Sequence, residues 1–362
     1  MDITLDDKLN VLQQISQRKL VDILDTIPGT KDLIIEQKLM KILDSFVGVT
    51  VLKRYGVDKI YKMEEGLKLS NSQRIFLVSN NLIACKRVLD QIQSEISHVT
   101  RPHVQVCHHL LVMPFVPAVL HNLVEEEGLA ELVTLQTLSA EFIKLDGNVL
   151  SLENPMFIDL YYHKDISLLR ALARNLWSLQ LIFGSPRLSL LVGKHSEQVG
   201  KLMESMEQCL GASSLENEVG ALIVMDRSFD LTTTLLTPVT YSGLLNEVTE
   251  VNVGTAVLGK SQVKLDPNKD QIYGEAQILN IVSNQEKDPR SFEDLTNLSS
   301  CVVKGQRGPL SPKMVVICVI GGITCAEIAA CRLIEKSTGI RLILASDTIL
   351  TGNKLVQRIQ EI

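Results

Sequence analysis

Residues 220–248 read GALIVMDRSFDLTTTLLTPVTYSGLLNEV and set the expected architecture of the chain. Within them, residues 221–225 are five apolar residues in a row with no polar residue between them. Such a run is typical of a strand covered on both faces, as in a parallel sheet with helices on each side. Charged residues begin at Asp226, so they are expected at the carboxyl end of the strand, where open α/β sheets place their functional loops.

Three charged residues follow this strand and allow two interpretations: Asp226, Arg227 and Asp230. In the first, the carboxylates hold magnesium and the arginine binds a phosphate, which gives a nucleotide- or phosphoryl-binding enzyme that uses Asp226 and Asp230. In the second, the two carboxylates share the guanidinium of Arg227 and fix the loop. We prefer the second, because the sequence shows no second acidic strand end and no phosphate-binding loop that would complete a phosphotransferase site.

The N-terminal part of the chain alternates between strand and helix patterns. Strands are expected at 32–36, 74–79 and 104–113, brief extended pieces at 49–52 and 59–63, and helices at 4–27, 37–46, 82–96 and from Pro117 to Gly128. This alternation predicts a parallel sheet flanked by helices.

A second alternating region follows. Short strands are expected at 131–154, then a helix at 165–184, a strand at 188–192 and a helix at 197–210; after residue 312 come strands at 314–320 and 341–345 and helices at 324–337 and 348–359. Residues 265–304 have a linker-like composition. The predicted fold is therefore α/β with two domains, each a parallel sheet flanked by helices. The domains are expected at 1–128 and 129–267, followed by a linker at 268–311 and a further α/β segment at 312–362.

Two short motifs could suggest a ligand site. Gly321-Gly322 after a strand could hold a phosphate at a helix N-terminus, but Thr324-x-x-Glu327 is better explained as a capping box, with the glycines forming the turn. Cys107-His108-His109 could suggest zinc. Adjacent strand residues point to opposite faces and cannot all bind one ion. We therefore assign no catalytic residue, no cofactor and no metal ligand.

Composition favours a soluble globular protein. Of the 362 residues, 45% are hydrophobic and 22% are charged, and the net charge of −6 argues against a nucleic-acid partner. Seven cysteines are scattered singly, which favours a reduced, cytoplasmic compartment. The acidic N-terminus lacks the apolar segment of a signal peptide, so any membrane association is expected to be peripheral and through partners.

The segment after the strand also resembles the central signature of a known family. The matching residues are Asp226-Arg227-x-x-Asp230, Thr237-Pro238 and Thr240-Tyr241-x-Gly243-Leu244, which resemble the Sec/Munc (SM) family of SNARE regulators. The blocks Pro28-Gly29-x-Lys31-Asp32-Leu33-x-Ile35-Glu36 and Val57-Asp58-Lys59-x-Tyr61-Lys62 resemble the vacuolar protein sorting-associated protein 33 branch, of B type.

This resemblance implies a function. It implies a binding scaffold, not an enzyme, that regulates SNARE-mediated vesicle docking and fusion in endosome-to-lysosome transport. Its implied partners are syntaxin-type SNAREs and a helical class C vacuolar-sorting subunit, on late endosome and lysosome membranes. The signature residues Asp226, Arg227, Asp230, Tyr241 and Gly243 are expected to brace a loop. The resemblance also implies that residues 312–362 are the C-terminal part of the second domain. The family's largely helical third domain is expected to be mostly missing here, reduced to a shortened linker at 268–311.

Overall fold

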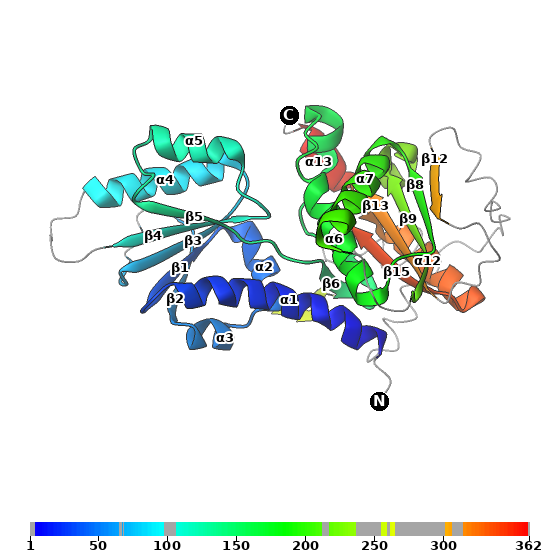
Figure 1. Ribbon diagram of the computed structural model, residues 1–362, viewed down its shortest axis with the longest axis horizontal. Helices are drawn as coiled ribbons and strands as arrows, with labels where there is room; N and C mark the ends of the chain where they lie inside the picture. The colour runs from blue at the N-terminus through cyan, green and yellow to red at the C-terminus, as the bar shows by residue number, and fades with distance from the viewer. Residues whose placement is uncertain are drawn as a thin grey trace. The chain divides into compact units, whose positions relative to one another are not determined.

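The computed structural model describes residues 4–64, 67, 69–97, 106–211, 217–236, 255–258, 261–264, 301–305 and 314–360. The chain divides into two compact units. One comprises residues 10–141 and is called the N-terminal unit; the other comprises residues 1–9 and 142–362 and is called the C-terminal unit. Each unit is built on a mainly parallel sheet with helices against it, so the predicted fold class is confirmed (Figure 1).

The N-terminal unit contains a five-stranded parallel sheet in the order β2-β1-β3-β4-β5. Its strands are β1 (Lys31–Ile35), β2 (Val57–Lys62), β3 (Gln73–Ser79), β4 (Cys107–Met113) and β5 (Val133–Thr137). Its helices are α1 (Leu5–Thr26, which begins in the other unit), α2 (Gln37–Phe46), α3 (Val49–Arg54), α4 (Leu82–Ser97) and α5 (Ala118–Glu126). Helices α4 and α5 cover one face of the sheet through a fully apolar core (Figure 1).

Two features of this unit differ from the sequence prediction. Residues 49–54 form helix α3, where the β-branched Val49, Thr50 and Val51 had indicated an extended piece. The helix places Leu52, which is 2% exposed, in the core, so tertiary burial overrides the local preference. Strand β5 pairs with β4, so the N-terminal unit extends to Glu141, whereas the sequence placed the boundary after Gly128.

The C-terminal unit contains a seven-stranded sheet in the order β12-β8-β9-β13-β15-β7-β6. Its strands are β6 (Ile143–Asp146), β7 (Val149–Ser151), β8 (Leu188–Val192), β9 (Val219–Asp226), β12 (Cys301–Gly305), β13 (Met314–Ile320) and β15 (Arg341–Ser346). Strands β8, β9, β13, β15 and β7 are parallel, and β12 and β6 pair antiparallel at the two edges. Strands β14 (Ile323–Thr324) and β16 (Ile349–Leu350) form a small parallel pair, and β10 (Thr255–Leu258) and β11 (Ser261–Lys264) an antiparallel pair.

Helices lie on both faces of this second sheet. They are η1 (Asp159–His163), α6 (Leu169–Phe183), α7 (Lys194–Leu210), η2 (Arg227–Phe229), α8 (Thr232–Leu235), α12 (Cys325–Thr338) and α13 (Gly352–Gln360). Helices α6 and α7 lie on one face and α12 on the other (Figure 1). The expected covered strand is therefore observed as β9, whose Val224 is fully buried.

The residues after 312 complete the sheet that contains β9. Strand β13 pairs in parallel with β9 on one side and with β15 on the other. Among the described residues between 237 and 313, the only elements are the strands β10, β11 and β12, and β12 extends the second sheet at its edge. Of the linker expected at 268–311, the structure describes only residues 301–305. No helix in the described parts of the chain is both long and apolar enough to cross a membrane.

Candidate functional site

Four neighbouring parallel strands of the C-terminal unit end along one edge of its sheet. Strand β8 leads into Gly193, β9 ends at Asp226, β13 leads into Gly321 and β15 leads into Asp347. In open α/β sheets this edge is where nucleotides and other ligands bind. The residues at these strand ends therefore form the candidate functional site.

Asp226 caps the N-terminus of α7. Its carboxylate accepts hydrogen bonds from the backbone N–H of His195 (2.8 Å) and of Ser196 (2.7 Å), and from the Ser196 hydroxyl. Free N–H groups and the helix dipole make a helix N-terminus a site for anions. Gly193 has a φ of +110°, and a Cβ there would overlap the Asp226 carboxyl group. The anion position of this helix is thus filled by a side chain of the protein itself.

Asp347 fills a second anion position. Its Oδ1 accepts hydrogen bonds from the backbone N–H of Gly321 (2.7 Å) and Gly322 (2.9 Å), and its Oδ2 accepts one from Met156 (2.8 Å). Burial raises the pKa of Asp347, and these N–H donors act in the opposite direction. The glycine N–H groups that could have held a phosphate therefore already bind a buried carboxylate.

Arg227 connects the end of β9 to the turn after β13. Its guanidinium donates to both carboxylate oxygens of Glu327 (2.8 and 2.7 Å) and, through Nε and Nη2, to the carbonyl of Gly322 (3.0 and 2.6 Å). A fifth hydrogen bond goes to the carbonyl of Asp230 (3.1 Å). The Arg227 side chain is 2% exposed, so this is a buried, bidentate ion pair.

Asp230 and Thr324 act as caps close to Arg227. The Asp230 carboxylate accepts from the backbone N–H (3.0 Å) and the hydroxyl of Thr233 at the start of α8, and these bonds lower the pKa of Asp230. Thr324 and Glu327 form the predicted capping box of α12. Glu327 therefore serves both the helix cap and Arg227.

The observed arrangement corrects two sequence predictions. The carboxylates of Asp226 and Asp230 do not share Arg227, whose acidic partner is Glu327 instead. The prediction that no second acidic strand end exists is also wrong, because Asp347 follows β15 as Asp226 ends β9. The sequence did indicate this second acidic strand end, because Ser346 and Asp347 directly follow the apolar residues 342–345. The predicted signature residues Tyr241 and Gly243 lie outside the described residues.

Other residues of the candidate site could not be identified from the sequence, because they lie far along the chain from the residues they contact. Gly193 and Ser196 precede Asp226 by about 30 residues, and Met156 precedes Asp347 by 191 residues.

Tyr161, from η1, packs edge-on against the His195 ring at 5.2 Å between centroids. Burial and the nearby Asp226 raise the pKa of Tyr161 to about 12, so its hydroxyl remains neutral. His195 Nδ1 lies 3.3 Å from Asp226 Oδ2 without a hydrogen bond between them.

The two histidines of β4 bind separate partners. His108 Nε2 lies 3.2 Å from Glu95 Oε2, and His109 Nε2 lies 3.1 Å from Gln73 Oε1. Among the described residues no group of three or more His, Cys, Asp or Glu side chains could hold a metal ion. These histidines contribute to packing within the N-terminal unit.

His109 gives the N-terminal unit a pH dependence. Burial lowers the pKa of His109, with smaller contributions from His108 and Lys31, and its Nδ1 has no hydrogen-bond partner. The pKa of His109 in the folded state is below its unfolded value of about 6.5. The contribution of His109 to stability is therefore fully present above that pH and is lost as pH falls through the folded pKa. We expect the urea midpoint to fall between pH 7.5 and 5.5, and to fall less in a His109→Gln variant. An equal fall in both proteins would contradict this assignment.

The chemical capacity of the candidate site follows from these contacts. The helix N-terminus and the Gly321-Gly322 turn are each occupied by a carboxylate, and Arg227 is held by Glu327 and two carbonyl oxygens. Each group that could bind a phosphate is thus engaged within the protein. The arrangement joins four strand ends and the N-termini of three helices, α7, α8 and α12.

Comparison with known proteins identifies the family. The Sec1 family matches residues 31–299 and 283–358. Vacuolar protein sorting-associated protein 33B of Homo sapiens is 26% identical over 282 residues, which cover 76% of this chain and 45% of that protein. The vacuolar protein-sorting-associated protein 33 homolog of Arabidopsis thaliana is 25% identical over 310 residues, which cover 81% and 52% of the two chains. The chain spans about half the length of these curated relatives.

Solved structures share the fold. The SM protein Vps45 in complex with the Qa SNARE Tlg2 matches with a TM-score of 0.60 at 10% identity, covering 97% of this chain and 98% of that chain. The Unc18–syntaxin 1 complex from Monosiga brevicollis matches with a TM-score of 0.58 at 10% identity, covering 98% and 99%. The chain therefore belongs to the Sec1 family, that is, to the SM proteins, and resembles their vacuolar protein sorting-associated protein 33 branch.

Proposed function

We propose that the chain is an SM-type regulator of SNARE-mediated vesicle docking and fusion in endosome-to-lysosome transport, and that it acts as a binding scaffold. The observation that carries this proposal is the family match, which extends over both units. Two solved relatives of the same fold are complexes, one with a Qa SNARE and the other with a syntaxin. The names of the curated relatives support a role in vacuolar protein sorting.

The geometry of the candidate site supports a scaffold without catalysis. A phosphoryl-transfer site needs unoccupied donors to bind the phosphate and carboxylates that are free to hold a metal. In this chain Asp226 caps α7 and Asp230 caps α8, and the glycine N–H groups bind Asp347. No observation in the described residues favours the alternative, an enzyme that uses Asp226 and Asp230. We infer that the signature residues Asp226, Arg227 and Asp230 brace the scaffold.

The proposed partners are a syntaxin-type SNARE and the helical class C vacuolar-sorting subunit, with peripheral association on late endosome and lysosome membranes through them. A direct test immobilises the purified chain and measures binding of soluble fragments of syntaxin-type SNAREs and of the class C subunit by biolayer interferometry. Saturable binding of at least one fragment is expected. Absence of binding to both classes, with a folded chain by circular dichroism, would refute the proposal.

A further inference from the structure

Strand β12 lies at the edge of the seven-stranded sheet, where it pairs antiparallel with β8 (Figure 1). Each residue of β12 has a partner in β8, from Cys301 opposite Val192 to Gly305 opposite Leu188. Among the described elements, β12 is the one that pairs with the outer side of β8. Its departure would therefore leave backbone N–H and C=O groups of β8 unpaired along that side.

Strand β12 is less buried than the strand with which it pairs. Its residues 302–304 are half-buried and Gly305 is exposed. By contrast, four of the five residues of β8 are 1–2% exposed: Leu188, Leu190, Leu191 and Val192. A strand held by few buried contacts opens at a lower free-energy cost than the core of the sheet. We therefore expect β12 to open more readily than β8.

Lys304 of β12 meets an acidic face of α7. Its Nζ lies 2.6 Å from Oε1 of Glu204. Glu197 lies on the same face, about two helical turns earlier. The pKa of Glu197 is lowered by Lys201 and, to a smaller extent, by Lys304. At this position of an edge strand a cation is therefore favoured and an anion is opposed.

The positions on either side of Lys304 have different requirements. Val303, opposite Leu190, packs against the apolar core of the C-terminal unit. Gly305 has a φ of +111°, and a Cβ there would lie 2.2 Å from the carbonyl oxygen of Arg187. Glycine is the residue that adopts this backbone conformation without a steric cost. An occupant of this edge therefore needs an apolar residue, a cation and a glycine in succession.

We propose that residues 301–305 are a releasable strand, which occupies in cis an edge site for an extended segment of a partner protein. The partner segment carries an apolar residue, a lysine or arginine and a glycine in succession, and pairs with β8 in place of β12. Main-chain hydrogen bonds supply the affinity and the three side-chain positions the specificity, as in other cases of strand addition. The proposal uses the C-terminal unit alone and does not rest on the trafficking function.

Hydrogen exchange of the wild-type chain tests whether β12 is released. The amides of β12 that pair with β8 are expected to exchange at least about a hundredfold faster than those of β9 in the interior of the same sheet. Equal rates in the two strands would mean that β12 opens only when the whole sheet unfolds, and would overturn the proposal.

Peptide binding tests the acceptor edge. In a Gly305→Val chain the new side chain meets Arg187, which weakens β12 in cis and leaves β8 unchanged. A labelled, end-capped peptide of residues 299–306 with Cys301→Ser is titrated and followed by anisotropy. It should bind Gly305→Val at least about tenfold more tightly than the wild type, whose own strand competes. The matched control, Gly339→Val, has a φ of +71° and open space around it, and should bind as weakly as the wild type.

The cation position tests the specificity. A peptide with Lys304→Glu should bind the Gly305→Val chain about threefold more weakly, because its carboxylate meets Glu204. Adding Glu204→Lys to that chain should reverse the preference, so that the acidic peptide becomes the tighter one. Equal affinities for the two peptides in both chains would contradict the assigned register.

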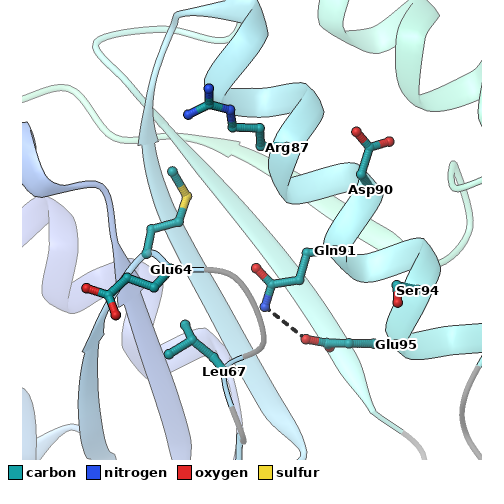
Figure 2. Close-up of a pocket in the computed structure, with 8 residues that line it drawn as sticks. Glu64, Leu67, Arg87, Asp90, Gln91, Ser94 and Glu95 are labelled. Atoms are coloured by element: carbon teal, nitrogen blue, oxygen red, sulfur yellow. Dashed lines mark hydrogen bonds between the residues drawn. The ribbon is translucent and has the colours of Figure 1, made fainter.

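A cavity of about 440 Å³ in the N-terminal unit, between α4 and the chain that follows β2, is the alternative site for a cationic peptide (Figure 2). Its lining carries three carboxylates and one arginine, and Gln91 donates a hydrogen bond to Glu95 at 3.0 Å. Asp90→Asn together with Glu64→Gln removes two of these carboxylates and should leave peptide binding to the Gly305→Val chain unchanged. Loss of binding in that variant would place the peptide in the cavity and refute the edge site.

Three further results would count against the proposal. The first is a folded Gly305→Val chain without saturable peptide binding. The second is an unfolded Gly305→Val chain by circular dichroism, since β12 would then be essential to the sheet. The third is a wild-type dimer by light scattering that Val303→Asp abolishes, because this edge would then belong to a second copy of the chain.

Discussion

Replacing Arg227 with methionine is expected to lower the free energy of unfolding of the C-terminal unit by about 3–5 kcal/mol. The Arg227 side chain is 2% exposed and that of Glu327 is 25% exposed, so the substitution leaves a carboxylate largely out of water without its partner. It also removes both donors to the carbonyl of Gly322. Urea denaturation followed by circular dichroism measures the loss.

The matched control is Lys201→Met in α7 of the same unit. Lys201 forms an exposed pair with Glu197 at 2.7 Å, one turn away along the helix, and such pairs contribute little to stability because water screens them. A double-mutant cycle of Arg227→Met with Glu327→Gln should give a coupling energy of about 1–3 kcal/mol, because the two side chains are in contact. Losses of similar size for Arg227→Met and Lys201→Met would show that the buried pair does not brace the unit.

Asp226→Ala is expected to destabilise the C-terminal unit by about 3 kcal/mol. The change removes an N-cap, which contributes about 0.5–2 kcal/mol, and leaves the buried donors of Ser196 unsatisfied, at a further cost of about 1–3 kcal/mol. Hydrogen exchange at the amides of His195 and Ser196 should accelerate, since both donate to this carboxylate.

Asp230→Ala provides the comparison, because the Asp230 carboxylate is more exposed than that of Asp226 and accepts the backbone N–H of Thr233 at the start of the four-residue helix α8. Its loss should cost no more than about 1 kcal/mol. Equal destabilisation by the two substitutions would mean that burial of the cap has no influence on its contribution to stability. That outcome would contradict the central role of Asp226 in bracing the C-terminal unit.

Most strands of the two sheets could be predicted because their burial is encoded in contiguous residues, but β12 lies within the predicted linker at 268–311 and was missed. The apolar runs at 188–192 and 314–320 coincide with β8 and β13, and the amphipathic pattern at 37–46 coincides with α2. Helix α3 was missed, since its β-branched residues favour a strand when considered alone. The assignment of β5 to the first sheet depends on pairing with β4, which no local pattern contains.

The sequence could predict where the candidate site lies, but not which of its residues contact one another. The sequence indicated that charged residues lie at the end of β9, and the capping box at Thr324 was also predictable, because its two partners are three residues apart. Two partners of Arg227, Gly322 and Glu327, lie 95 and 100 residues further along the chain, and the partners of Asp226 lie about 30 residues earlier. Such pairings are set by the order of strands in the sheet, so neighbouring residues give no indication of them.

The most direct measurement is a thermal-shift titration of the full chain with Mg²⁺ alone, MgATP, MgGTP and inorganic phosphate. If the carboxylates of Asp226 and Asp347 occupy the two anion positions, none of these ligands should raise the melting temperature at millimolar concentration. A ligand bound there would stabilise the folded chain by about 2.7 kcal/mol at a hundredfold excess over its dissociation constant. A saturable rise in melting temperature that is lost in Asp226→Asn would contradict the account.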